Sequence, residues 1–257
     1  MASPSTPDRP PSVTASMYSS GKYSDMTIIC KGTTFKVHQC IVCLQSKPLA
    51  AAMDGNFKEG TSNVINLEDD QPEIVEKMLS YMYTSDYSDQ QNSTIRTEIT
   101  VVCGPGGSVY LKETTTASTS NLVISSAPLT NAQVFVIADK YDVQGLKELA
   151  EKKYEEAIAG SWNSASFVAS LKLLYEETLE SDRALKDAAA KVAGQHAREL
   201  VDRGEFAALC KEHGQIAFDV LKSSILEPAK PAKPSSCRQC GCAGQWFCKN
   251  CRCHAYG

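Results

Sequence analysis

The segment that decides how this chain begins to fold is residues 24–38, Ser-Asp-Met-Thr-Ile-Ile-Cys-Lys-Gly-Thr-Thr-Phe-Lys-Val-His. It contains two runs rich in β-branched and aromatic residues, Asp25–Cys30 and Thr33–His38. Between them lies Lys31-Gly32, a pair suited to a tight turn. The segment therefore predicts a β-hairpin at the start of the folded region.

Three further elements follow this hairpin. Ser46 is suited to cap a helix that continues to Met53, with a proline in its first turn. Val64–Leu67 predicts a third short strand. A second helix is expected from Pro72, because apolar residues then recur at helical spacing as far as Met82. This order of short strands and helices indicates an α+β fold.

The composition excludes several classes of protein. Of 257 residues, 42% are apolar and 22% charged, so a wholly disordered or fibrous chain is not expected. The net charge of −4 provides no chain-wide basic field for nucleic acid. Apolar runs are too short for a membrane span, and Met1–Ser20 lacks the layout of a secretory signal. We therefore expect no membrane contact and an intracellular location, in the nucleus or cytoplasm.

Changes in composition divide the chain into five regions. Residues 1–20 are rich in Ser, Thr and Pro, and residues 227–236 are rich in Pro. In residues 160–226 the apolar residues recur only at helical spacing. Together they predict a disordered tail (1–20), a first domain (21–159) with a Ser/Thr-rich insertion and a possible hairpin (88–128), a helical extension (160–226), a linker (227–236) and a cysteine-rich tail (237–257).

The first domain resembles the BTB/POZ family. Asp25–Tyr87 is similar to its first half and Val134–Tyr154 to its closing helices. The order of parts is most like BTB proteins of filamentous fungi. The resemblance implies a small β-sheet flanked by α-helices. It is carried by Ser24-Asp25, Phe35–His38, Ser46, Phe57–Glu59, Val64–Leu67 and Tyr81–Thr84.

The resemblance implies a protein-interaction scaffold and not an enzyme. BTB domains commonly self-associate, which implies a homodimer, and many serve as adaptors that recruit clients to a cullin ubiquitin ligase. The sequence agrees, because it contains no phosphate-binding loop, nucleophile elbow or paired carboxylates. Protein partners, a cullin scaffold among them, are therefore expected.

Phe57-Lys58-Glu59 matches the hydrophobic-x-Glu pattern that the family uses at the cullin contact. An exposed Phe57 would offer a rigid apolar anchor, and Glu59 would satisfy a donor at the rim. The alternative is that Phe57 packs on its own domain and Glu59 is solvated. The three residues alone leave both interpretations open.

Asp25 and His38 match structural positions of the family. In BTB domains that bind co-repressors, the acid is partnered by a basic residue after the histidine, but here Gln39 stands at that position. We therefore expect Asp25 to be a structural cap or an interface residue. His38 is expected to be structural, because no nucleophile is placed beside it in the sequence.

The eleven cysteines fall into two groups. Cys103 lies apart from apolar patterns, whereas Cys30, Cys40, Cys43 and Cys210 lie in or beside them and are expected to be small buried residues. The other six lie between residues 237 and 253. An odd number of cysteines without a signal peptide argues against a disulfide framework, so the dense group suggests metal binding.

The spacing in the tail predicts a zinc site. A Cys-x-x-Cys turn places two thiolates on one side of a loop, and two such turns complete a tetrahedron. The primary ligand set is Cys237, Cys240, Cys248 and Cys251. Exchange of ligands or a second ion would involve the alternates Cys242, Cys253 and His254. The competing interpretation is a set of metal-free thiols.

The tail also suggests a second function. From residue 227 to the end it carries five Lys or Arg and one Glu, a charge of +4. Trp246 and Phe247 would stack on bases or form the small core of a zinc module. The alternative to the adaptor is thus a BTB-type transcription or chromatin regulator that uses its tail on nucleic acid. The patch is small, so protein partners remain the leading expectation.

Overall fold

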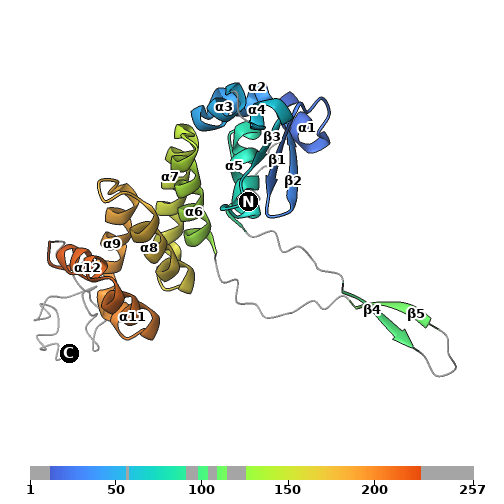
Figure 1. The fold of residues 1–257 in the computed structure, drawn as a ribbon. Helices are drawn as coiled ribbons and strands as arrows, with labels where there is room; N and C mark the ends of the chain where they lie inside the picture. Colours follow the sequence, from blue (N-terminus) through green and yellow to red (C-terminus); the bar gives the residue numbers. More distant parts are fainter. Residues whose placement is uncertain (1–11, 56–57, 91–97, 104–108, 115–125, 227–257) are drawn as a thin grey trace, which may run out of the picture. The chain divides into compact units, whose positions relative to one another are not determined.

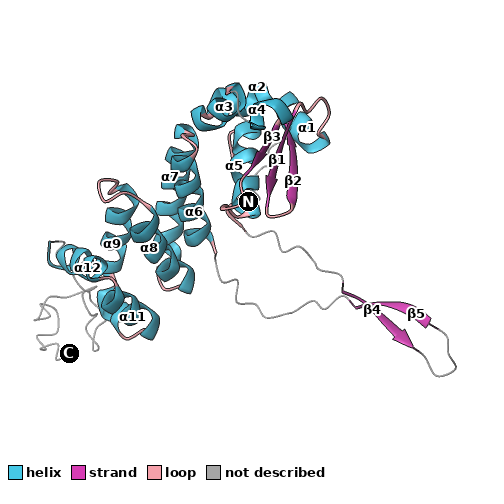
Figure 2. Ribbon diagram, in the orientation of Figure 1, coloured by secondary structure: helices cyan, strands magenta, loops and turns pink. Residues whose placement is uncertain are grey.

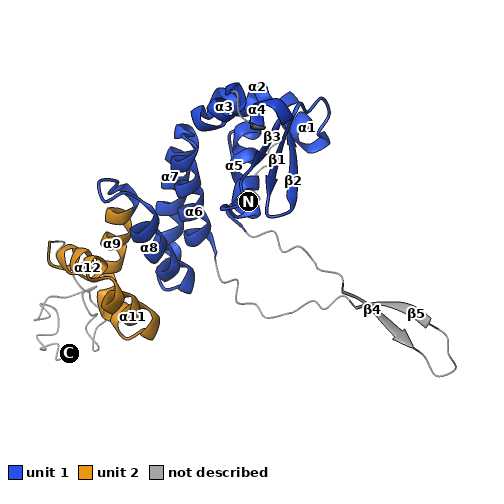
Figure 3. Ribbon diagram, in the orientation of Figure 1, with its two compact units in different colours: residues 1–185 blue, residues 186–257 orange. Residues whose placement is uncertain are grey.

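The computed structural model describes residues 12–55, 58–90, 98–103, 109–114 and 126–226 (Figure 1). The chain divides into two compact units, residues 1–185 and residues 186–257 (Figure 3).

The first unit contains the predicted hairpin within a three-stranded sheet (Figure 2). Strand β1 (Met26–Cys30) pairs antiparallel with β2 (Thr33–Val37) and parallel with β3 (Val64–Asn66). Lys31 and Gly32 have φ values of 45° and 83°. Positive φ at both central residues defines the type I′ turn, whose twist matches that of paired strands. The hairpin prediction is confirmed.

The core of this unit follows from two periodicities. Alternate residues of β1, namely Met26, Ile28 and Cys30, are buried. Helix α5 (Pro72–Thr84) buries one broad stripe, as its spacing predicted: Ile74, Val75, Met78, Leu79, Met82 and Tyr83. Helices α1, α2 and α6 pack around α5, which joins the N-terminal helices to α6.

The prediction of a disordered tail over residues 1–20 is wrong for residues 13–20. These residues form α1 (Val13–Ser20), which begins where Ser12 Oγ accepts a hydrogen bond from the Ala15 N–H at 3.1 Å. The Tyr18 ring stacks on the Tyr83 ring at 4.8 Å. Helix α1, half of whose residues are Ser or Thr, is therefore held by a residue of α5 that is distant in sequence. Residues 1–11 lie outside the described residues.

Three short helices connect β2 to β3: α2 (Gln39–Gln45), α3 (Lys47–Asp54) and α4 (Lys58–Ser62). Ser46 caps α3 as predicted, because its Oγ accepts a hydrogen bond from the Leu49 N–H at 3.3 Å. The same hydroxyl donates to the Tyr141 carbonyl at 2.7 Å. The buried Ser46 side chain thus caps α3 and also joins α3 to the end of α6.

The other described residues of the first unit form helices and one hairpin. Strands β4 (Glu98–Cys103) and β5 (Val109–Thr114) pair antiparallel, which confirms the predicted hairpin. Helix α6 (Ala127–Lys140) begins just inside the predicted end of the insertion. It packs on α7 (Gln144–Ser161) and α8 (Ala165–Glu177). Their shared core includes Phe135, Leu146, Tyr154 and Phe167.

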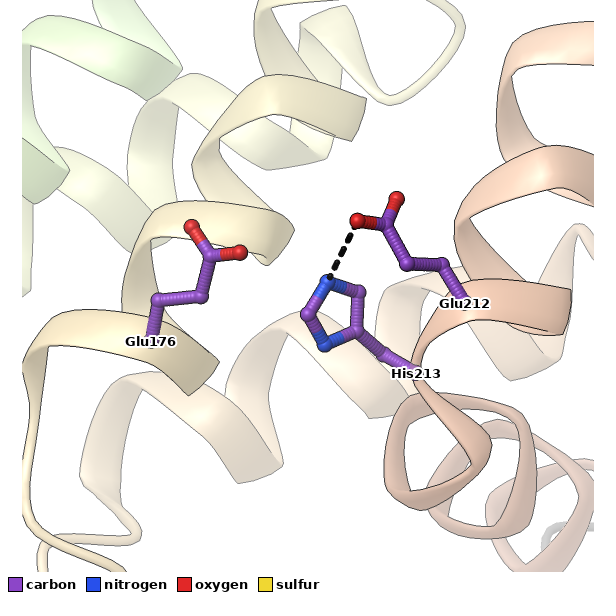
Figure 4. Close-up of side chains that lie close together, drawn as sticks. All are labelled: Glu176, Glu212 and His213. Atoms are coloured by element: carbon purple, nitrogen blue, oxygen red, sulfur yellow. Dashed lines mark ion pairs between the residues drawn. The ribbon is translucent and has the colours of Figure 1, made fainter.

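The second unit continues with α9 (Ala184–Gln195), α10 (Ala197–Val201), α11 (Gly204–Glu212) and α12 (Gly214–Leu226). His196 separates α9 from α10: it is the residue before α10, it has φ −112°, and it is half-buried. Figure 4 shows Glu212, the last residue of α11, and His213, the residue between α11 and α12; Glu212 Oε1 lies 3.8 Å from His213 Nε2.

Among the described helices, none has the length and apolar character needed to cross a bilayer.

Candidate protein-interaction surface

A buried hydrogen-bond network fixes the end of the hairpin. His38 is 2% exposed. Its Nε2 lies 2.8 Å from the Lys22 carbonyl, which assigns the proton to Nε2. Its Nδ1 then accepts from the Tyr83 hydroxyl at 2.9 Å, and the His38 backbone N–H donates to the same hydroxyl at 2.7 Å. Because both ring nitrogens are used in this network, His38 holds α5 to the hairpin.

Asp25 sets the start of α2. Its Oδ1 accepts a hydrogen bond from the Gln39 N–H at 2.8 Å. A carboxylate at the first N–H groups of a helix satisfies a donor and meets the positive end of the helix dipole. Asp25 therefore acts through the backbone of Gln39, and its contact does not need the basic residue that co-repressor-binding domains have there.

The three residues of the predicted cullin contact lie at the start of α4. Phe57 lies outside the described residues, Lys58 opens the helix, and Glu59 lies half-buried in its first turn. Gly60 holds this turn close to the end of α3. A Cβ at Gly60 would lie 2.5 Å from the Met53 carbonyl oxygen and 2.6 Å from that of Gly55. Only glycine fits this approach without a shift of backbone.

We expect Gly60→Ala to destabilise the protein by about 1–3 kcal/mol, the usual cost of forcing an atom into a closed contact. Gly160→Ala in α7 is the matched control, because nothing lies within 4 Å of the position that its methyl group would take and alanine favours a helix. Unfolding in urea measures the stability of both variants. Equal midpoints for Gly60→Ala and the natural chain would contradict the close approach.

Three large apolar side chains of the first unit are exposed near its N-terminal elements. Val13 on α1 is 79% exposed, Tyr23 after α1 is 77% exposed and Leu44 on α2 is 86% exposed. We call them the exposed apolar set. Single exposed apolar residues are ordinary, but Leu44 is a long side chain left almost wholly in water on a helix that packs on α5. These residues offer apolar contact to a partner protein.

The described cysteines depart in part from the prediction of burial. Cys30 is buried, whereas Cys43 and Cys210 are half-buried and Cys40 is exposed. Helix α2 turns its Val42 side inward, so Cys40 lies on the solvent side two positions away. Burial raises the pKa of the Cys43 thiol, and Asp54 and Asp25 raise it further. This favours the neutral thiol at Cys43 and lowers its reactivity.

The predicted zinc ligands lie outside the described residues. These are Cys237, Cys240, Cys248 and Cys251, together with the alternates Cys242, Cys253 and His254. The zinc site therefore stays a prediction from spacing. The sequence analysis included Tyr83 only as part of the motif Tyr81–Thr84 and did not predict its contact with His38, and it assigned no role to Gly60.

Comparison of the sequence with known proteins identifies similarity in the N-terminal part of the chain. Residues 15–100 match the family model of the BTB/POZ domain. A BTB/POZ domain-containing protein of Arabidopsis thaliana is 31% identical over 85 residues, which are 32% of this chain and 10% of that protein. The match includes most of α1, a helix outside the domain boundaries predicted from the sequence, and ends before α6 and α7. This chain therefore contains a BTB/POZ domain over residues 15–100.

Proposed function

We propose that this protein is an interaction scaffold whose BTB/POZ domain pairs with a second copy and recruits clients to a cullin ubiquitin ligase. BTB/POZ domains are in general protein-interaction modules rather than enzymes. The observation that carries the proposal is the exposed apolar set, Val13, Tyr23 and Leu44, on and beside helices packed around α5. Apolar side chains on a rigid support suit association with another protein.

The cullin contact is proposed for Phe57, Lys58 and Glu59. The contact of Gly60 with the end of α3 supports this, because it fixes the first turn of α4 on a packed element. Glu59, in that turn, is half-buried and therefore suited to the rim of an interface. Phe57 would supply the apolar anchor.

If this contact is correct, Phe57→Ala should weaken cullin binding by ~2 kcal/mol, the threshold of an interface hot spot. This is a loss of roughly thirtyfold in affinity. Glu59→Ala should cost less, because a rim residue stays partly hydrated. Isothermal titration calorimetry with a purified cullin N-terminal domain measures the affinity of the natural chain, of Phe57→Ala and of Glu59→Ala.

Leu179→Ala is the matched control, because Leu179 is a 71% exposed apolar residue that follows α8. It should leave the affinity unchanged. An affinity of the natural chain no better than millimolar would refute the adaptor function. Tight binding that Phe57→Ala leaves intact would remove these three residues from the contact.

Self-association is proposed for the exposed apolar set. A pair of copies would cover Val13, Tyr23 and Leu44, which water now surrounds. Sedimentation velocity over a range of concentrations tests this proposal. A monomer at all concentrations would reject it without bearing on the cullin contact.

The competing function is transcription or chromatin regulation through the C-terminal tail. The tail charge of +4 favours it. We further propose that zinc, held by Cys237, Cys240, Cys248 and Cys251, folds this tail. Titration with duplex DNA at several salt concentrations, beside a cullin pull-down, separates the two functions. Salt-sensitive DNA binding without cullin capture would favour the regulator.

A further inference from the structure

Helix α12 is apolar on two opposite sides, but the described residues of the second unit cover only one of them. Ile216 and Val220 are buried, and Ser223 lies on the same side. This side is packed closely against α9, because a Cβ at Gly194 would lie 2.9 Å from the Ser223 Cβ. The side of α12 that carries Ile216, Val220 and Ser223 is therefore the inward side, and α9 packs against it.

The opposite side of α12 carries Phe218, Leu221 and Ile225, spaced by three and four residues. At 3.6 residues per turn these positions share one side, turned away from Ile216 and Val220. Their exposed fractions are 60%, 57% and 70%. We call them the outer face of α12. An apolar stripe on a helix is normally buried, so the outer face needs a cover.

The size of the outer face limits what covers it. A helix of 13 residues is about 20 Å long and about 10 Å across, so its footprint is on the order of 200 Å². Stable interfaces between separate proteins bury about 800 Å² on each partner. The face is too small to hold a second copy by itself. A tethered segment has an effective concentration of about 1 mM and needs far less area.

The chain continues from the last residue of α12 into such a segment. The proline-rich linker 227–236 spans up to about 31 Å when extended. The distance along the helix from Leu226 back to Phe218 is about 12 Å. The linker is therefore long enough for the residues after it to return over the whole outer face. These residues include two adjacent large aromatic residues, Trp246 and Phe247.

We propose that the C-terminal segment 237–257 docks on the outer face of α12 through Trp246 and Phe247. The contact would bury aromatic rings against Phe218, Leu221 and Ile225, and it would place the basic tail beside α12. It does not require zinc. It does require that the two aromatic residues face α12 and do not form a separate core inside the tail.

The test uses the full chain with Trp162→Phe, so that Trp246 is the single tryptophan. Adding Phe218→Glu should lower the docked-to-free ratio by about tenfold or more, since it removes a buried aromatic contact. Trp246 emission should move to longer wavelength and acrylamide quenching should rise. Val201→Glu, at a 60% exposed apolar residue of α10, is the control and should change neither. Unchanged quenching after Phe218→Glu would overturn the proposal.

A second measurement keeps Trp162 in place. Trp246→Ala with Phe247→Ala in the natural chain should uncover the outer face and raise the fluorescence of added 8-anilinonaphthalene-1-sulfonate. Adding Phe218→Glu to that variant should reverse the increase. The absence of an increase in dye fluorescence would also overturn the proposal. So would a dimer that forms with rising concentration and that Phe218→Glu dissociates. Zinc content measured in the same Phe218→Glu protein should stay unchanged, which separates this contact from metal binding.

Discussion

Replacing Cys237 and Cys240 with serine should abolish zinc binding by this protein and unfold residues 237–257. The segment from Cys237 to His254 holds seven potential ligands but only two large apolar residues, Trp246 and Phe247. Apolar burial within so short a segment cannot fold it. Metal binding would supply its folding free energy, of order 10 kcal/mol for structural zinc sites at neutral pH. Elemental analysis of protein purified without chelator, followed by release with a thiol-reactive mercurial, gives the zinc count.

Cys242→Ser is the matched control, because Cys242 is outside the primary ligand set and this variant should keep its metal. The melting transition of residues 12–226 should be nearly the same in all variants, because the contact proposed between the tail and α12 does not require zinc. Less than about 0.2 zinc per chain, after growth in zinc-supplemented medium, would make metal-free thiols the correct interpretation.

Local signals predicted the elements of the BTB/POZ domain. Lys31-Gly32 specifies its own turn, and Ser46 caps α3 with its own hydroxyl. Helix α1 was not predicted, because half of its residues are Ser or Thr and its support is the stacking of Tyr18 on Tyr83. That contact joins residues 65 positions apart, and a local pattern does not contain it.

The candidate surface was predictable only in part for the same reason. The family resemblance placed Asp25 and His38 at structural positions, and Asp25 does cap α2 through Gln39. The partner of His38 is Tyr83, 45 residues away. The requirement for glycine at position 60 comes from carbonyl groups at the end of α3. Each of these contacts exists only after the chain has folded.

High pH should unfold the first unit cooperatively, and the ionisation of buried tyrosines should accompany the unfolding. Burial is the largest cause that raises the pKa of six tyrosines: Tyr18, Tyr81, Tyr83, Tyr87, Tyr141 and Tyr154. At Tyr141, the hydrogen bond of 2.6 Å to the Asp70 carboxylate raises the pKa further. The stability these groups contribute is complete below the unfolded tyrosine pKa of about 10. It is lost as pH rises through the folded pKa values, because the unfolded chain then releases more protons than the folded one.

Absorbance at 295 nm and circular dichroism, measured together from pH 8 to 13 on one sample, should show one shared steep transition. Tyr154→Phe should move it to higher pH. This variant leaves no buried donor without a partner, because the Ser170 hydroxyl that contacts Tyr154 Oη at 2.9 Å already donates to the Phe167 carbonyl at 2.7 Å. Tyr23→Phe, at a 77% exposed ring, should leave the transition in place. Gradual tyrosine ionisation while the circular dichroism stays native would show that these hydroxyls are not buried as described.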